Sequence, residues 1–172
     1  MILESLGLKN YIDEFLDFSN VYFLQFTYYK AAQPQREDVS KIRLRDHTDD
    51  DFFTIVKKNQ GGLQLHRKNG EWIDLNNVSP NSYVALVADS FMAWTNNTLE
   101  SATHRVTMEG DIDRVSIQLF SSAKPSDIIE AKKELVDEEH PIIFKPYDTV
   151  GYYEYIKSGA GAGLGLKAYL GV

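Results

Sequence analysis

The stretch HRVTMEGDIDRVSIQLF, residues 104–120, decides the fold of this chain. Its first residues suit a strand, residues 108–111 suit a turn, and the remainder suits a return strand. Because side chains alternate along a strand, the return strand has two different faces. One face carries Arg114, Ser116, Gln118 and Phe120, and the other carries Val115, Ile117 and Leu119.

The same alternation of strand-like runs and turns continues through the middle of the chain. Between Ile42 and Phe120, short runs that suit strands alternate with turn signals. These signals lie at residues 59–62, 68–70, 79–81 and 96–97. The spacing predicts an antiparallel sandwich or barrel, and so a mainly β fold.

The two ends of the chain flank this β region with helices. Apolar residues at roughly helical spacing in residues 1–18 predict a helix end and a short second helix. The aromatic run 21–29 predicts a strand, and residues 30–41 predict a loop. After residue 125 the pattern becomes charged and helical, with a C-terminal helix over residues 152–157. We therefore divide the chain into the end of an N-terminal helical region (1–19), a β core (20–125) and a C-terminal helical extension (126–172).

Composition excludes several classes of protein. The 172 residues suit one domain with its own core. A net charge of −7 and the lack of a basic stripe argue against a nucleic-acid partner. The absence of Cys excludes disulfides, thiolate zinc sites and a Cys nucleophile. With no signal-peptide pattern and no stretch near the ~18 apolar residues of a membrane span, we expect a cytoplasmic monomer that does not enter a membrane.

Three residues have the chemistry of a metal site. His47 and Asp49 are two positions apart, so a strand would project both to the same side. Together with His104 they supply the two imidazoles and one carboxylate of the facial triad that holds Fe(II) and leaves positions open for substrate and O₂. Each also has an ordinary interpretation, because the acidic run 49–51 suits a solvated loop and His104 suits a hydrogen-bonded core position. His66 and His140 lie in charged contexts and are expected at the surface.

Arg114 and Ser116 form a candidate clamp for an organic acid. The guanidinium fork matches a carboxylate in a bidentate way, and the Ser116 hydroxyl adds a donor. The alternative is a surface Arg that pairs with Asp111 or Asp113. An Arg in a buried strand, flanked by aliphatic residues, needs an anionic partner. The order His-x-Asp, His, Arg-x-Ser therefore points to an iron- and 2-oxoglutarate-dependent dioxygenase.

The glycine-rich segment Gly159-Ala160-Gly161-Ala162-Gly163-Leu164-Gly165 suggests a nucleotide loop at first sight. Its spacing does not fit G-x-G-x-x-G, and no predicted strand precedes it. A flexible linker to a short terminal helix is the better interpretation. The segment therefore does not predict a nucleotide cofactor.

Eight segments carry a resemblance to a known family. They are Leu3-Glu4-Ser5-Leu6-Gly7-Leu8, His47-Thr48-Asp49, Phe53-Thr54-Ile55, Asn69-Gly70-Glu71-Trp72-Ile73, Ala88-Asp89-Ser90, His104-Arg105-Val106, Leu135-Val136-Asp137-Glu138-Glu139-His140-Pro141 and Phe144-Lys145-Pro146-Tyr147-Asp148. Over essentially its whole length the chain resembles the plant soluble 2-oxoglutarate/Fe(II) dioxygenases, which include gibberellin oxidases and flavonoid oxygenases. The likeness is closest to the AOP type, which acts in glucosinolate side-chain metabolism.

The resemblance implies a double-stranded β-helix, a jelly-roll barrel with Fe(II) at its mouth, 2-oxoglutarate as co-substrate and O₂ as oxidant. It also implies a small organic substrate, such as a glucosinolate side chain, a gibberellin or another specialised metabolite, and release of succinate and CO₂. By motif, the family's iron ligands fall on His47, Asp49 and His104. Its 2-oxoglutarate binders fall on Arg114, Ser116 and Tyr29, and a position that lines the substrate pocket falls on Phe120.

The chain also departs from the family pattern. In the Asn-Tyr-Tyr-Pro motif around Tyr29, Thr27 replaces Asn and Lys30 replaces Pro, while Val115 replaces the Tyr of Arg-Tyr-Ser. Asn97 replaces the Gly of a tight turn, where Asn tolerates a positive φ. The family's N-terminal helices and early strands are missing, so we expect an exposed apolar face. Two alternatives remain: a shortened, non-catalytic relative that keeps the fold, and a cupin-like binder of another divalent metal.

Overall fold

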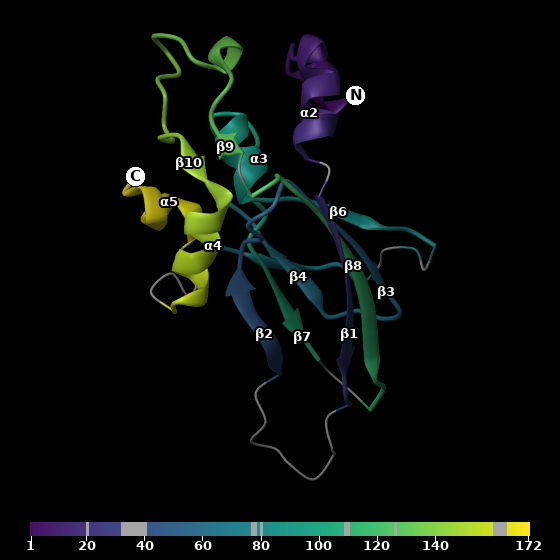
Figure 1. The fold of residues 1–172 in the computed structure, drawn as a ribbon. Helices are drawn as coiled ribbons and strands as arrows, with labels where there is room; N and C mark the ends of the chain where they lie inside the picture. Colours follow the sequence, from purple (N-terminus) through teal and green to yellow (C-terminus); the bar gives the residue numbers. More distant parts are fainter. Residues whose placement is uncertain are drawn as a thin grey trace.

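Two antiparallel sheets, each of four strands, form the jelly roll in this computed structural model (Figure 1). The structure describes residues 1–19, 21–31, 41–76, 79, 81–108, 111–125, 127–159 and 165–172. The first sheet has the order β1 (Val21–Tyr29), β8 (Arg114–Ser122), β3 (Phe53–Lys58) and β6 (Val84–Val87). The second has the order β2 (Ile42–His47), β7 (His104–Thr107), β4 (Leu63–His66) and β5 (Trp72–Asp74).

The predicted strands of residues 104–120 are present as β7 and β8, but they do not pair with each other. Strand β7 pairs with β2 and β4 in the second sheet, whereas β8 pairs with β1 and β3 in the first. The connection therefore crosses from one sheet to the other, and its predicted turn residues 109–110 lie outside the described residues. This crossing places His104 and Arg114 on different sheets.

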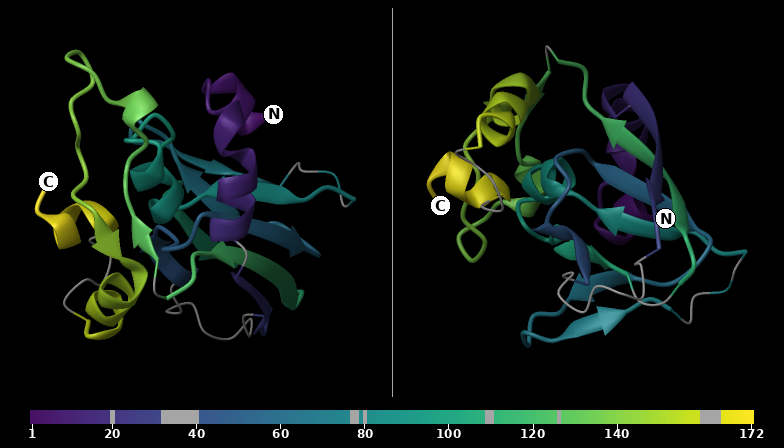
Figure 2. Two further views of the ribbon diagram at one scale, coloured as in Figure 1. Left: turned by 45° about the horizontal axis from the view of Figure 1, so that its top comes forward. Right: turned by 90° about the horizontal axis from the view of Figure 1, so that it is seen from below.

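The helices gather at one end of the two sheets (Figures 1 and 2). They are α1 (Ile2–Ser5), α2 (Ile12–Phe18), α3 (Asp89–Trp94), α4 (Thr149–Lys157) and α5 (Gly165–Leu170), with short 3₁₀ turns η1 (Lys9–Tyr11) and η2 (Lys133–Leu135). The two predicted N-terminal helices and the predicted helices at the C-terminus are confirmed. Most of the predicted linker, residues 160–164, lies outside the described residues, as does most of the predicted loop 30–41.

The helical character expected of residues 126–148 is mostly wrong. Apart from η2, the described part of this segment consists of bends, irregular chain and the two-residue strands β9 (Ile128–Ile129) and β10 (Tyr147–Asp148), which pair with each other. Pro141 and Pro146 lack a backbone N–H and disfavour helix at the residues before them. The charged pattern therefore marks an exposed connection and not a helix.

The main hydrophobic core lies among the helices, next to one end of the sheets. Helix α3 contributes Phe91, Met92, Ala93 and Trp94 to this core, and both termini of the chain join it through Phe15 of α2 and Tyr152 of α4. A smaller cluster of Val56, Leu63 and Leu86 fills part of the space between the sheets. Since Val56 and Leu86 belong to the first sheet and Leu63 to the second, this cluster joins the two layers.

Strand β8 has one buried face, and that face is the polar one. Arg114 and Ser116 are each 1% exposed, whereas Val115 and Ile117 are 41% and 36% exposed. The expectation that these aliphatic residues flank Arg114 inside a buried strand is therefore wrong, because the first sheet is open on its outer side. The exposed apolar face that the sequence predicts is this outer side, formed by Tyr22, Leu24, Phe26, Tyr28, Ile55, Val115 and Ile117.

The tight turn that the sequence places at Asn97 is present. Asn96 and Asn97 both have positive φ, at 48° and 64°, so the turn forms without Gly.

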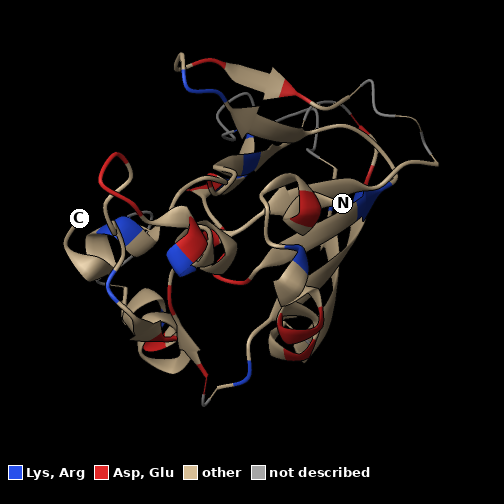
Figure 3. Cartoon of the chain, turned by 90° about the horizontal axis from the view of Figure 1, so that it is seen from above, with Lys and Arg blue, Asp and Glu red and all other residues tan. Residues whose placement is uncertain are grey.

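Basic and acidic segments are interspersed on the face seen in Figure 3. None of the described helices is long and apolar enough to cross a membrane.

Candidate functional site

His47, Asp49 and His104 come together at the end of the sheets that carries the helices. His47 ends β2, His104 begins β7, and the two residues are register partners whose ring centroids are 4.2 Å apart. Asp49 Oδ1 lies 3.6 Å from His47 Nε2 and 3.8 Å from His104 Nε2. One ligand atom from each residue lies within 4.8 Å of the other two. The donor set that the sequence suggested is therefore assembled in space.

Asp49 reaches this cluster from a loop. Strand β2 ends at His47, and the chain then crosses to the other sheet before β3 begins at Phe53. His47 and Asp49 therefore converge as predicted, but strand alternation is not the cause, because Asp49 lies outside β2. The carboxylate is directed instead by the hydroxyl of buried Thr54, which donates a hydrogen bond to Asp49 Oδ2.

A backbone carbonyl orients each imidazole. His47 Nδ1 is 2.8 Å from Arg45 O, and His104 Nδ1 is 2.9 Å from Ala102 O. Because a carbonyl can only accept, Nδ1 carries the proton in each neutral ring and Nε2 keeps its lone pair. The two Nε2 atoms are the ones that face Asp49. Metal-ligating histidines show this arrangement, with the remaining nitrogen donating to a fixed acceptor.

The electrostatics of the cluster also suit a divalent ion. His104 is 6% exposed, and this burial lowers its pKa and favours the neutral form that can bind a metal. Two neutral imidazoles and a carboxylate on one side of an ion suit Fe(II), since they hold it without closing its coordination shell. A hydrogen-bonded core histidine alone does not account for the convergence of the other two groups. The residues present therefore fit the metal.

The acidic run that contains Asp49 is not a solvated loop. Asp51 is 3% exposed, and burial raises its pKa to about 9. Its Oδ2 accepts a hydrogen bond from Ser121 N on β8 at 3.2 Å. Burial also raises the pKa of Asp50. The ordinary interpretation of the run is therefore wrong, because the loop packs between the sheets and the helices.

Arg114 is buried on the inner face of β8. Its Nε donates to Gly61 O and its Nη1 to Ser116 Oγ, each at 3.0 Å. These bonds use two of the five N–H donors of the guanidinium. The alternative of a surface pair with Asp113 is wrong, because Asp113 accepts from Tyr28 Oη and Ala31 N. Among the described residues no carboxylate forms an ion pair with Arg114, so its charge favours a ligand anion.

Gln118 is a neighbour of this clamp that the sequence placed on the same face without giving it a role. Its Nε2 donates to Ser116 Oγ at 2.8 Å, so Ser116 accepts from both Gln118 and Arg114. A hydroxyl that accepts two hydrogen bonds still has its own hydrogen to donate. Tyr29 lies opposite Arg114 in the register of β1 and β8, and its ring centroid is 5.6 Å from the Arg114 Cζ. The structure therefore groups Tyr29 with Arg114 and Ser116.

Phe120 lines a cavity of about 520 Å³ between the first sheet and helix α4. Other lining residues come from β1, from the loop after Asp49, and from α4, and they include Phe23, Asp50 and Tyr153. Phe120 was a candidate from its motif position, whereas these three were not, because they lie far from it in the chain. The only available signal was the position of Asp50 directly after a predicted ligand.

Comparison with known proteins agrees with this geometry. A family model described as the 2OG-Fe(II) oxygenase superfamily matches residues 19–123. This span includes the described parts of strands β1 to β8 and the cluster of His47, Asp49 and His104. Arg114 and Ser116 lie within the same span.

The relatives are longer than this chain. The chain is 39% identical over 164 residues to the probable 2-oxoglutarate-dependent dioxygenase AOP1.2 of Arabidopsis thaliana, covering 94% of this chain and 50% of that protein. The dioxygenase for auxin oxidation from rice has a TM-score of 0.81 at 30% identity, covering 92% of this chain and 52% of that one. JOX2, solved in complex with 2OG, Fe and JA, has a TM-score of 0.78 at 28% identity, covering 91% of this chain and 46% of that one. The chain thus spans about half the length of the curated relatives that it matches.

Proposed function

The chain belongs to the 2OG-Fe(II) oxygenase superfamily, and from this premise we propose that it is an Fe(II)- and 2-oxoglutarate-dependent dioxygenase of a small organic molecule. The observation that carries the proposal is the convergence of His47, Asp49 and His104, with both Nε2 atoms facing the carboxylate. The catalytic core is the β region of residues 20–125.

His47, Asp49 and His104 would hold the iron. With 2-oxoglutarate and O₂ bound, Fe(II) supplies the oxidation chemistry that yields succinate, CO₂ and an oxidised substrate. The chain's own contribution is to position the ligands. The carbonyls of Arg45 and Ala102 fix the tautomer of the two histidines, and the Thr54 hydroxyl fixes the carboxylate.

Arg114, Ser116 and Tyr29 would bind 2-oxoglutarate. The guanidinium donors that have no hydrogen-bond partner among the described residues, together with the Ser116 hydroxyl hydrogen, match the carboxylate of the co-substrate that lies far from the metal. Tyr29 is half-buried beside Arg114, where its ring shields the ion pair from water. Because this clamp is buried, the attraction between guanidinium and carboxylate is stronger than it would be at the surface.

Phe120 and the cavity beside it would bind the organic substrate. The lining is largely apolar, with Phe23, Val150 and Tyr153 facing the same space as Phe120. A hormone-like or specialised-metabolite substrate suits such a lining, and the name of the rice relative refers to one such molecule, auxin. We also propose a cytoplasmic monomer without a nucleic-acid or membrane partner, in keeping with the net charge of −7 and the lack of Cys.

An anaerobic titration of the apoprotein with Fe(II) and 2-oxoglutarate tests the proposal. We expect a visible metal-to-ligand charge-transfer band, followed by succinate release when O₂ and a substrate are admitted. A folded protein that gives neither band nor succinate would be a non-catalytic relative. Binding of a divalent metal without any effect of 2-oxoglutarate would indicate a cupin-like binder.

Replacing Gln118 by Leu tests the arrangement around Ser116. We expect the affinity for 2-oxoglutarate to fall by roughly 3- to 10-fold, because the loss of one hydrogen bond costs about 1 kcal/mol. Fe(II) affinity should stay at the wild-type value. Anaerobic calorimetry measures Fe(II) affinity on the apoprotein and 2-oxoglutarate affinity on the Fe(II)-loaded protein. Asn69→Ala, which removes a side-chain hydrogen bond to Glu71 in the exposed turn between β4 and β5, is the control; equal 2-oxoglutarate affinities in the two variants would contradict the role of Gln118.

A further inference from the structure

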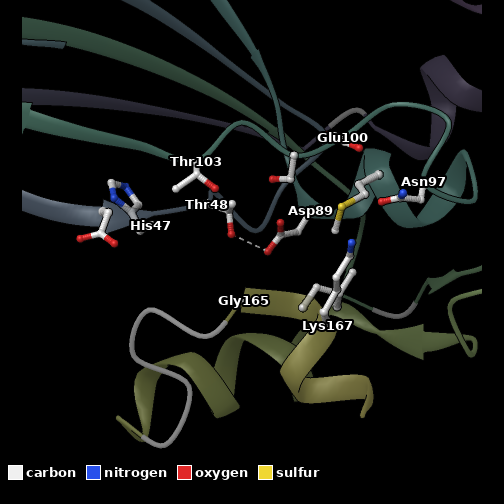
Figure 4. A pocket seen from close by; sticks show the side chains of 12 residues that line it. His47, Thr48, Asp89, Asn97, Glu100, Thr103, Gly165 and Lys167 are labelled. Atoms are coloured by element: carbon white, nitrogen blue, oxygen red, sulfur yellow. Dashed lines mark hydrogen bonds between the residues drawn. The ribbon is translucent and has the colours of Figure 1, made fainter. Parts of the chain in front are cut away.

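We propose that Asp89 is a positioning residue for the metal centre, through which helices α4 and α5 hold the His47–Asp49 segment in place. The inference rests on the proposed function, since it concerns the same centre. Asp89 is the first residue of α3 and is 1% exposed. It lies between Thr48 and the start of α5, beside a cavity of about 250 Å³ (Figure 4).

Helix α3 begins against the loop that carries Asp49. The backbone N–H of Asp89 donates to Asp49 O at 2.9 Å. Ser90 donates twice more, from Oγ to Asp50 O at 2.6 Å and from its N–H to Asp51 O at 3.0 Å. The loop lies between strands β2 and β3, so these backbone carbonyls have no partners on a described neighbouring strand. The three bonds from α3 satisfy these carbonyls instead. The start of α3 therefore determines the path of the backbone next to the predicted iron ligand.

The Asp89 side chain joins this loop to the C-terminal helices. Its Oδ2 accepts from Thr48 Oγ1 at 3.0 Å and from Tyr152 Oη at 2.5 Å, and its carboxylate also accepts from the backbone of Leu166 in α5. Gly165 has a φ of +65°, and a Cβ there would lie 3.3 Å from Thr48 Oγ1. A side chain at residue 165 would be strained at this φ and would crowd Thr48, so Gly suits the start of α5.

Thr48 is the residue between two predicted iron ligands. A bond that fixes Thr48 also fixes how far the side chains of His47 and Asp49 can separate. A buried carboxylate with several donors is costly to move, because each donor would lose its partner in a poorly solvated place. Groups that orient metal ligands in this way typically account for 10- to 100-fold in metal affinity. The C-terminal helices thus contribute to the centre without touching it.

Thr48→Val and Tyr152→Phe each remove one hydroxyl donor to Asp89 and keep the shape of the side chain. We expect each to lower Fe(II) affinity about 10-fold in an anaerobic titration. In the double variant the fold-loss of Fe(II) affinity should be smaller than the product of the two single fold-losses, since both hydroxyls act through one carboxylate. Amide hydrogen exchange of the apoprotein gives a readout that does not need the metal: residues 47–53 should exchange faster in both variants.

Two matched substitutions separate this role from general stability. Thr95→Val removes a buried hydroxyl that donates to Phe91 O and Met92 O of α3 and accepts from the N–H of Leu99. Tyr11→Phe removes a surface bond to Glu134. Both should leave Fe(II) affinity and the exchange of residues 47–53 at wild-type values, even where the melting temperature falls. If Thr48→Val matches Thr95→Val in both measurements, Asp89 is merely structural and the proposal is wrong.

The outcomes also separate this proposal from the proposed function. Failure of the wild-type protein to bind Fe(II) would show that the metal centre is assigned wrongly. The exchange measurement on the apoprotein would then still test whether Asp89 holds the His47–Asp49 segment in place. Faster exchange of residues 47–53 in Thr48→Val and Tyr152→Phe would support the positioning role. Unchanged exchange would overturn it. Asp89→Asn is a third variant. An amide has one oxygen that accepts and one NH₂ group that only donates, so it cannot accept all the hydrogen bonds that the Asp89 carboxylate accepts.

Discussion

Replacing His104 by Ala is expected to lower Fe(II) affinity more than about 100-fold and to abolish the charge-transfer band formed with 2-oxoglutarate. Removal of one of three ligands should exceed the 10- to 100-fold effect of groups that only orient a ligand. The effect should be large here because His104 is 6% exposed and its Nε2 faces Asp49 Oδ1 at 3.8 Å. Anaerobic Fe(II) titration, followed by addition of 2-oxoglutarate, measures both changes.

His140→Ala is the matched control for this substitution. His140 is exposed and pairs with Asp137 at the surface, so its loss should leave Fe(II) affinity unchanged. Because His104→Ala also opens a small cavity, His104→Gln is a second variant that keeps most of the volume. Wild-type Fe(II) affinity in a folded His104 variant would show that the cluster is not the metal centre.

Replacing Arg114 by Ala should lower the affinity for 2-oxoglutarate by about 100-fold or more, which corresponds to roughly 3 kcal/mol. The guanidinium is buried, and no described carboxylate forms an ion pair with it, so we expect the ligand to supply its anionic partner. Arg114→Lys should recover only part of the loss, because an ammonium lacks the planar fork. Fe(II) affinity without 2-oxoglutarate should not change. Calorimetry with and without 2-oxoglutarate tests each statement.

The control for Arg114 is Arg105→Ala on the second sheet. The Arg105 guanidinium lies 3.9 Å from the centroid of the Trp72 ring, and its Nε donates to Gln64 Oε1. Its loss should cost some stability and leave 2-oxoglutarate affinity unchanged. Arg114→Met keeps most of the buried volume if the Ala variant does not fold. An Arg114 variant that still couples 2-oxoglutarate decarboxylation at the wild-type rate would show that the clamp is assigned wrongly.

Much of this site could be predicted from sequence because its chemistry is local. A His-x-Asp pair, a later His and an Arg-x-Ser pair are short patterns, and alternation along β8 already separated Arg114 and Ser116 from Val115. The same local logic found the strand Val21–Tyr29 and the helices at both ends. It did not find that β7 and β8 belong to different sheets, because pairing depends on partners far along the chain.

The sequence by itself determined which residues are the candidates for the chemistry, since residue type and spacing decide what a side chain can bind. The tertiary structure decided how those residues are held. It alone supplied the carbonyls of Arg45 and Ala102 for the histidines, and the links from Thr48 through Asp89 to Tyr152. It also decided that the aliphatic face of β8 is exposed. These features are contacts between segments distant in sequence, and only the packing of two sheets against the helices brings such segments together.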